Sequence, residues 1–232
     1  MRGHTVRCLI ASLVMAVSFV GMSSAATQDS DEPLSGAETD WVGVPPPEDC
    51  RVEPMTVDEF VDALETNMSE SSGVALEFQV PSEDDLPAGE PANDEIIEGI
   101  SATLWESTAC LNGGDFASFL ALMSPSGVQF FLLSILEALG RPPGPLTDEE
   151  IAQYEANITT MFAEAPEPYP LNERSSIDEI RNVLVLPDDR VLAVADGRIG
   201  DIDAIFAVFR ADDDRWLIDA FGVIGQLPEI QF

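Results

Sequence analysis

The spacing of apolar residues predicts a long helix near the middle of the chain. Within residues 94–111, apolar or small side chains recur at intervals of three and four, which places them along one side of a helix. These side chains belong to Ile97, Ile100, Leu104, Thr108 and Leu111. The run ends at Asn112, Gly113 and Gly114, residues typical of a helix C-terminus. We therefore expect a helix that buries one face.

Capping residues predict four further helices. Thr56 with Glu59, and Thr147 with Glu150, have the spacing of capping boxes, so they open helices that reach about residues 64 and 164. Asp115 is expected to cap a helix over residues 116–123. The pair 124–125, serine followed by proline, begins a helix to residue 139 that is apolar nearly all round. Such a helix must be covered on most sides or line a cavity.

After residue 176 the pattern changes to that of strands. Four β-rich runs, at residues 177–186, 190–196, 204–210 and 215–224, are separated by short polar turns. Connectors this short join antiparallel neighbours, so the runs predict a four-stranded meander. In the last two runs both alternating sets of positions are apolar, so both faces of the sheet need cover.

These elements define the predicted architecture. We expect an α+β fold in which N-terminal helices pack on a curved four-stranded antiparallel sheet, like a cone. Residues 1–26 resemble a signal peptide, and residues 27–49 form an acidic, proline-rich lead-in that is disordered or extended. Residues 50–92 form an extension with a short helix and a surface loop, in which residues 74–80 could make one strand. Residues 93–232 form the main domain, with a helical insertion at 141–172.

The N-terminus indicates export. Arg2 and Arg7 precede an apolar run over residues 8–20, and small residues follow up to Ala26. The apolar run is too short for a convincing membrane span, so we favour cleavage over a retained anchor. The expected location is secreted or extracytoplasmic, through a bacterial-type signal, with no stable membrane insertion after cleavage.

The net charge of the chain excludes two classes of partner. It has 43 acidic residues against ten basic ones, and its formal net charge is −33. Such a field repels nucleic acid and anionic lipid, so neither is an expected partner. Cation binding or an acidic recognition face would use this charge, but a solvating surface suited to high salt explains it as well.

Two cysteines remain after the signal, Cys50 and Cys110. An even number in an exported chain favours a disulfide. Cys110 lies off the apolar stripe of the predicted helix, where a core-filling cysteine would not be expected. We therefore favour a Cys50–Cys110 bridge over two free thiols. Neither cysteine has a base nearby in the sequence, which argues against a catalytic thiol.

Several chemistries are missing from the chain. The only histidine, His4, lies in the predicted signal, and there is no lysine. Imidazole catalysis, zinc ligation and lysine chemistry are therefore not expected. The acidic turns near residues 188, 201 and 212 do not match a calcium-binding loop, and no glycine-rich phosphate loop is present. We expect no metal and no cofactor.

Two segments resemble the nuclear transport factor 2-like superfamily, which includes SnoaL-like and ketosteroid-isomerase-like proteins. Residues 103–116, TLWESTACLNGGDF, look like its long helix, turn and second helix, and residues 214–219, DRWLID, look like its final strand. The resemblance covers about residues 93–224. It implies a cone with a deep pocket and dimerisation through the outer face of the sheet, but no reaction. The pocket histidine common in the SnoaL-like and dehydratase branches is absent here. The isomerase branch uses a carboxylate base with a tyrosine, but Tyr154 and Tyr169 lie outside the matched strands.

The candidate site residues have two interpretations each. Asp219 shares a strand with apolar neighbours and could be a desolvated catalytic acid with a raised pKa, or it could pair with Arg210 or Arg181. The other candidates are large aromatic residues that could line a pocket for an apolar ligand or simply fill the core. They are Trp105, Phe119, Phe130, Phe131 and Trp216.

Three functions follow from these interpretations. We favour a non-catalytic domain that binds a small apolar ligand or a protein, with a homodimer through the sheet as one form of partner. The alternatives are a carboxylate-based lyase or isomerase and a purely structural module. An enzyme predicts a buried carboxylate with a polar group in hydrogen-bond reach, a carrier predicts a roomy apolar cavity, and a packed interior favours protein binding.

Overall fold

A computed structural model describes residues 42–66, 79–80, 83–138, 146–199, 202–213 and 215–224 of the chain. The predicted signal and residues 27–41 of the lead-in lie outside the described residues. So do parts of the loop at 69–93 and the turn at 141–145. None of the described helices is long and apolar enough to cross a membrane.

The predicted helices are present, and their caps are the predicted ones. They are α2 (Val57–Thr66), α3 (Asp94–Gly113), α4 (Phe116–Ala121), α5 (Pro125–Ala138) and α6 (Asp148–Phe162). Both capping boxes form: the Thr56 backbone N–H donates to Glu59 Oε2 at 2.7 Å, and the Thr147 backbone N–H donates to Glu150 Oε2 at 2.7 Å. The hydrogen bonds from the backbone and hydroxyl of Thr56 also lower the pKa of Glu59. Asp115 accepts from Ser118 at the start of α4.

The four predicted strands form the centre of a larger sheet. They are β3 (Glu179–Val185), β4 (Val191–Ile199), β5 (Ile202–Asp212) and β6 (Arg215–Ile224), and each pairs antiparallel with the next. Two short edge strands extend the predicted sheet: β2 (Glu90–Pro91) pairs antiparallel with β3, and β1 (Gln79–Val80) pairs parallel with β6. Three 3-10 turns complete the described elements: η1 (Pro47–Asp49), η2 (Glu83–Asp85) and η3 (Leu171–Glu173).

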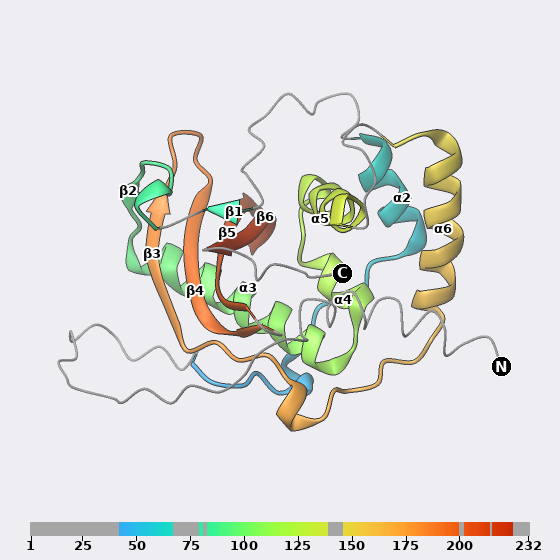
Figure 1. Cartoon of the computed structure of the whole chain (residues 1–232), viewed down its shortest axis with the longest axis horizontal. Coiled ribbons are helices and arrows are strands. Elements are labelled where there is room, and N and C mark those ends of the chain that lie inside the picture. The colour runs from blue at the N-terminus through green and yellow to red at the C-terminus, as the bar shows by residue number, and fades with distance from the viewer. Residues whose placement is uncertain are drawn as a thin grey trace.

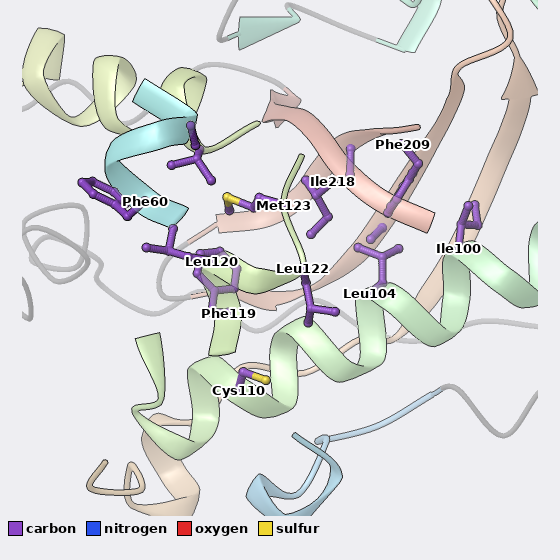
Figure 2. Close-up of a cluster of buried hydrophobic side chains, with 14 of the residues drawn as sticks. Phe60, Ile100, Leu104, Cys110, Phe119, Leu120, Leu122, Met123, Phe209 and Ile218 are labelled. Atoms are coloured by element: carbon purple, nitrogen blue, oxygen red, sulfur yellow. The ribbon is translucent and has the colours of Figure 1, made fainter. Parts of the chain in front are cut away.

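The helices bury one face of this sheet. Figure 1 shows α3 running across the strands, while α5 lies beside β6, α2 packs against α5, and α6 packs against the far side of α2. In Figure 2, Ile100 and Leu104 of α3 point toward Phe209 of β5 and Ile218 of β6. These four side chains belong to the larger of two buried apolar clusters. The predicted packing of helices on the sheet is therefore confirmed.

The other face of the sheet is also buried. Leu192 and Val194 of β4 and Phe206 and Val208 of β5 are each 0% exposed and form a second cluster. Strands that are apolar at both alternating sets of positions were expected to be buried on both faces of the sheet. Each face does carry a buried cluster. The dimer through the outer face of the sheet stays a prediction, and it would not use these four side chains because they are already buried within one chain.

A short segment before α2 lies against the side of α3 that faces away from the sheet. We call residues 43–51 the strap. Its Cys50 is bonded to Cys110 of α3, which confirms the predicted disulfide. Cys110 is nevertheless 0% exposed, because the strap covers a second face of α3 that the apolar stripe did not reveal. The last part of the predicted lead-in is therefore bound to the domain, and Gly43 pairs with Ile177 through two backbone hydrogen bonds.

Candidate functional site

The candidate acid Asp219 lies in a β-bulge of β6. Val208 of β5 faces Ala220, but the next residue, Phe209, faces Ile218, so Asp219 has no partner across the ladder. A bulge bends its strand and redirects the extra side chain. The connection between α4 and α5 runs beside β6 at this point, because the Ser124 backbone N–H donates to the Ile218 carbonyl at 2.9 Å. The bulge thus brings Asp219 next to the start of α5.

Both carboxylate oxygens of Asp219 have partners. Its side chain is 4% exposed, and Oδ1 accepts a 2.6 Å hydrogen bond from the Ser124 hydroxyl. Arg190 Nη1 lies 3.2 Å from Oδ2, and Arg210 Nε lies 3.4 Å from Oδ1. The predicted pairing with Arg210 is confirmed. Arg181 instead forms a bidentate ion pair with Asp196 on the neighbouring strand.

Arg190 is the residue that sequence reasoning missed. It stands directly before β4, whose register with β5 places it across from Arg210, and both arginines reach Asp219. Desolvation alone would lower the pKa of Arg190, but hydrogen bonds to Asp188 and Asp219 outweigh burial and raise it. The hydrogen bond from Arg190 in turn holds the pKa of Asp188 below its usual value. The cluster is thus a network of ion pairs around a cation that stays charged.

Ser124 connects this network to α5. While its hydroxyl donates to Asp219, the same oxygen accepts from the Gly127 backbone N–H at 3.0 Å, as an N-cap residue does. A side chain at Gly127 would collide with the backbone oxygen of Ile218, so α5 begins in close contact with β6. This arrangement fixes the position of α5 on the sheet. Both oxygens of Asp219 and the oxygen of Ser124 are already engaged in it, so none of them is left to act as a base.

Two of the three candidate phenylalanines, Phe119 and Phe131, pack against each other, and the third, Phe130, packs on Phe221. Phe131 of α5 lies 5.6 Å from Phe116 and 5.8 Å from Phe119 of α4, between ring centroids. It is also 5.7 Å from Phe221 of β6, which in turn contacts Phe130 at 6.0 Å. These are the separations of aromatic rings in direct contact. Phe119 is buried, and the other four rings are partly buried and pack against the apolar clusters.

The two tryptophans lie away from that cluster. Trp216 of β6 packs on α3 at Gly99, where an added Cβ would stand 2.6 Å from the indole ring. Trp105 is on the side of α3 that faces the strap, and its indole N–H donates to Asp49 Oδ2 at 2.9 Å. The five aromatic candidates therefore do not line one site.

Trp105 instead belongs to a surface hollow between α3 and the strap. The hollow has a volume of about 250 Å³, and its lining comes from both elements. The strap contributes Asp49 and Arg51, and α3 contributes Ala102, Trp105 and Glu106. In contrast to the buried ion pairs at Asp219, this site is open to a partner from outside.

Metal ligands are not gathered anywhere in the described part of the chain. No group of three carboxylate, thiol or imidazole side chains lies close enough there to hold one ion. Of the acidic turns considered as calcium ligands, residues 201 and 214 lie outside the described residues.

No protein-family model matches this chain, and no solved structure matches it. The chain is similar to a curated protein, the phosphoribosylaminoimidazole-succinocarboxamide synthase of Halorhodospira halophila. The two are 34% identical over 146 residues, which cover 58% of this chain and 44% of that enzyme. The chain thus spans less than half the length of this relative.

Proposed function

We propose that this chain is an exported, non-catalytic domain that binds a protein partner. The observation that carries the proposal is the packing of Phe116, Phe119, Phe131 and Phe221, whose rings fill the space where a ligand carrier would need a cavity. The strongly acidic surface supports a partner with positive charge, because the long-range field attracts such a partner.

A carboxylate enzyme is the second candidate, and one observation favours it. Asp219 is a buried carboxylate with the Ser124 hydroxyl 2.6 Å away, which is the pairing that general acid–base chemistry needs. Against it, the same carboxylate is held by two arginines, and the Ser124 oxygen caps α5. This candidate therefore ranks below protein binding.

The synthase activity of the relative is not proposed for this chain. Its name indicates a phosphoribosyl product, which is an anion, whereas this chain has a net charge of −33, no lysine and no glycine-rich phosphate loop.

Native mass spectrometry of the exported protein tests the proposal. We expect the mass of the chain without its signal, less two hydrogens for the disulfide, and no retained small molecule. Titration with Nile red, a neutral apolar dye, should show no saturable binding at one site. A stoichiometric ligand in the spectrum, or one-to-one binding of the dye, would show that the protein is a carrier instead.

A variant with an opened interior provides the matched control for the dye. Phe131→Ala removes the half-buried ring at the centre of the aromatic cluster and opens an apolar cleft between Phe116, Phe119 and Phe221. Folded Phe131→Ala protein should therefore gain dye binding that the original chain lacks. If this variant does not fold, the result for the original chain still decides between the two functions.

A further inference from the structure

The hollow between the strap and α3 is built around the disulfide. Asp49 and Arg51 flank Cys50 in the strap, while Trp105 and Glu106 precede Cys110 by about one turn of α3. The covalent bond therefore holds the two walls at a fixed separation. A site whose walls are held in this way pays little conformational entropy when a partner enters it.

Asp49 organises the lining of the hollow. Its Oδ2 accepts from the indole N–H of Trp105 at 2.9 Å, and its Oδ1 accepts from Arg51 Nη2 at 2.8 Å. The carboxylate thus fixes the position of the ring and neutralises the one cation of the lining. Both of its oxygens are used within the chain.

Glu106 carries the charge that is left over. Its Oε1 accepts from the Arg51 backbone N–H at 3.0 Å. Within the described residues its Oε2 accepts no hydrogen bond, and Arg51 is already paired with Asp49. The hollow therefore presents one negative charge beside an aromatic ring and the methyl group of Ala102.

We propose that this hollow binds the side chain of one arginine from a protein partner. The guanidinium would donate to Glu106 Oε2, and its planar face and stem would lie against Trp105 and Ala102, contacts that suit arginine better than lysine. This inference rests on the proposed protein-binding function and names the chemistry of the partner. The volume of about 250 Å³ is below the range of roughly 300–1,000 Å³ typical of small-molecule pockets, so one side chain fits better than a cofactor.

Other occupants suit the lining less well. An anion would meet the unpaired carboxylate oxygen of Glu106 and the negative field of the whole chain. A divalent cation such as calcium takes six or more oxygen ligands, whereas both oxygens of Asp49 are already hydrogen-bonded.

Titration of the ¹⁵N-labelled protein with two short peptides tests the proposal. One is acetyl-Gly-Arg-Gly-amide, and the other has citrulline in place of arginine, which keeps the shape and removes the charge. The indole N–H signal of Trp105 is identified by its loss in Trp105→Phe. We expect a saturable shift of this signal with the arginine peptide and at least about fivefold weaker binding of the citrulline peptide. Equal affinities for the two peptides would overturn the proposal.

A charge-matched pair of variants locates the binding. Glu106→Gln keeps a carbonyl oxygen for the Arg51 N–H but loses the charge. It should therefore lower the affinity for the arginine peptide about fivefold. Glu155→Gln removes the same charge from an exposed position on α6 and should change the affinity less than about twofold. Equal weakening by both variants would show a general charge effect and refute the site.

The two proposals fail separately. If the interior binds dye while Trp105 still discriminates arginine from citrulline, the protein-binding function is wrong as stated but the hollow is an arginine site. If Trp105 does not discriminate, the hollow is not an arginine site, whatever the interior does. Should Glu106→Gln fail to fold, the two peptides on the original chain decide the matter.

Discussion

The two sides of α3 are held to the rest of the molecule by different forces. On the side toward the sheet, Ile100 and Leu104 are buried among side chains of β5 and β6, and the contacts are apolar (Figure 2). On the side toward the strap, Cys110 is bonded to Cys50, and Asn112 forms hydrogen bonds to the backbone. One helix thus joins a core stabilised by buried area to a peripheral segment stabilised by individual bonds.

The difference follows from the composition of the strap. It contains three consecutive prolines, at residues 45–47, and few large apolar side chains, so it cannot bury enough surface to hold itself in place. Directional and covalent bonds compensate for the missing area. Removing one such bond should therefore release the strap and leave the sheet intact, whereas damage to the core should weaken both sides.

The disulfide should give the largest effect. Replacing both partners, Cys50→Ala with Cys110→Ala, should lower the free energy of unfolding by about 4 kcal/mol, the chain-entropy value for a loop of this length. Urea denaturation measures the change, and the original protein treated with a reductant should match the double variant. A loss below about 1 kcal/mol would mean that the other bonds of the strap suffice without it.

A truncation in the core tests the other side of the helix. Leu104→Ala should cost about 3 kcal/mol, because Leu104 is 4% exposed and its removal leaves a cavity against the sheet. Amide hydrogen exchange should then accelerate in β5, β6 and the strap alike. Acceleration confined to the strap would contradict the proposed division between the two sides.

The amide of Asn112 should have a smaller and more local effect. This side chain is 1% exposed; it donates to the carbonyls of Pro45 and Ser175 at 2.9 and 3.0 Å and accepts from the Ser175 N–H at 2.8 Å. Asn112→Ala should cost about 2 kcal/mol, because the buried Pro45 carbonyl loses its hydrogen bond, while the half-buried Ser175 groups can partly exchange theirs for water. Hydrogen exchange should accelerate at residues 43–47 and 175–177 and stay unchanged in β5.

Acid should weaken an ion pair at the turn between β3 and β4. The hydrogen bond from Arg190 holds the pKa of Asp188 below its usual 3.8, so this pair stabilises the fold above about pH 3.8 and is lost as pH falls through the lower folded value. Asp188→Asn should therefore flatten the dependence of the urea midpoint on pH below 4. The expected difference is at most about 0.5 kcal/mol, since Asp188 is half exposed, and an unchanged pH dependence would count against the pair.

Much of the fold could be predicted because its signals are local. Thr56, Asp115 and Thr147 cap helices through residues three positions away, so a short stretch of sequence contains the whole interaction. The strands were recognised by their residue pattern and turns, and the disulfide followed from an even number of cysteines after a predicted export signal.

The misses depend on contacts between distant parts of the chain. The edge strand β2 is two residues long and exists only through pairing with β3, whereas β1 lies at the end of the strand proposed over residues 74–80, the rest of which lies outside the described residues. Asp219 was singled out, but the cation before β4 that holds it depends on the register of three strands. The aromatic candidates were grouped because they could line one pocket or fill the core, and sequence could not show that Trp105 faces the strap while Phe131 packs between α4 and β6.

The bulge at Asp219 also shifts the alternation of side chains in β6 by one residue, so that different positions face the helices before and after it. Before it, the even-numbered Trp216 and Ile218 share the helix-facing side, and after it that side belongs to the odd-numbered Phe221 and Val223. Deleting Asp219 itself would restore an unbroken pleat with both halves on their present faces, whereas deleting or inserting a residue elsewhere in the strand would turn one half to the wrong face. The length of β6, and not only its composition, is therefore under constraint, and insertions or deletions there should be tolerated far less than substitutions.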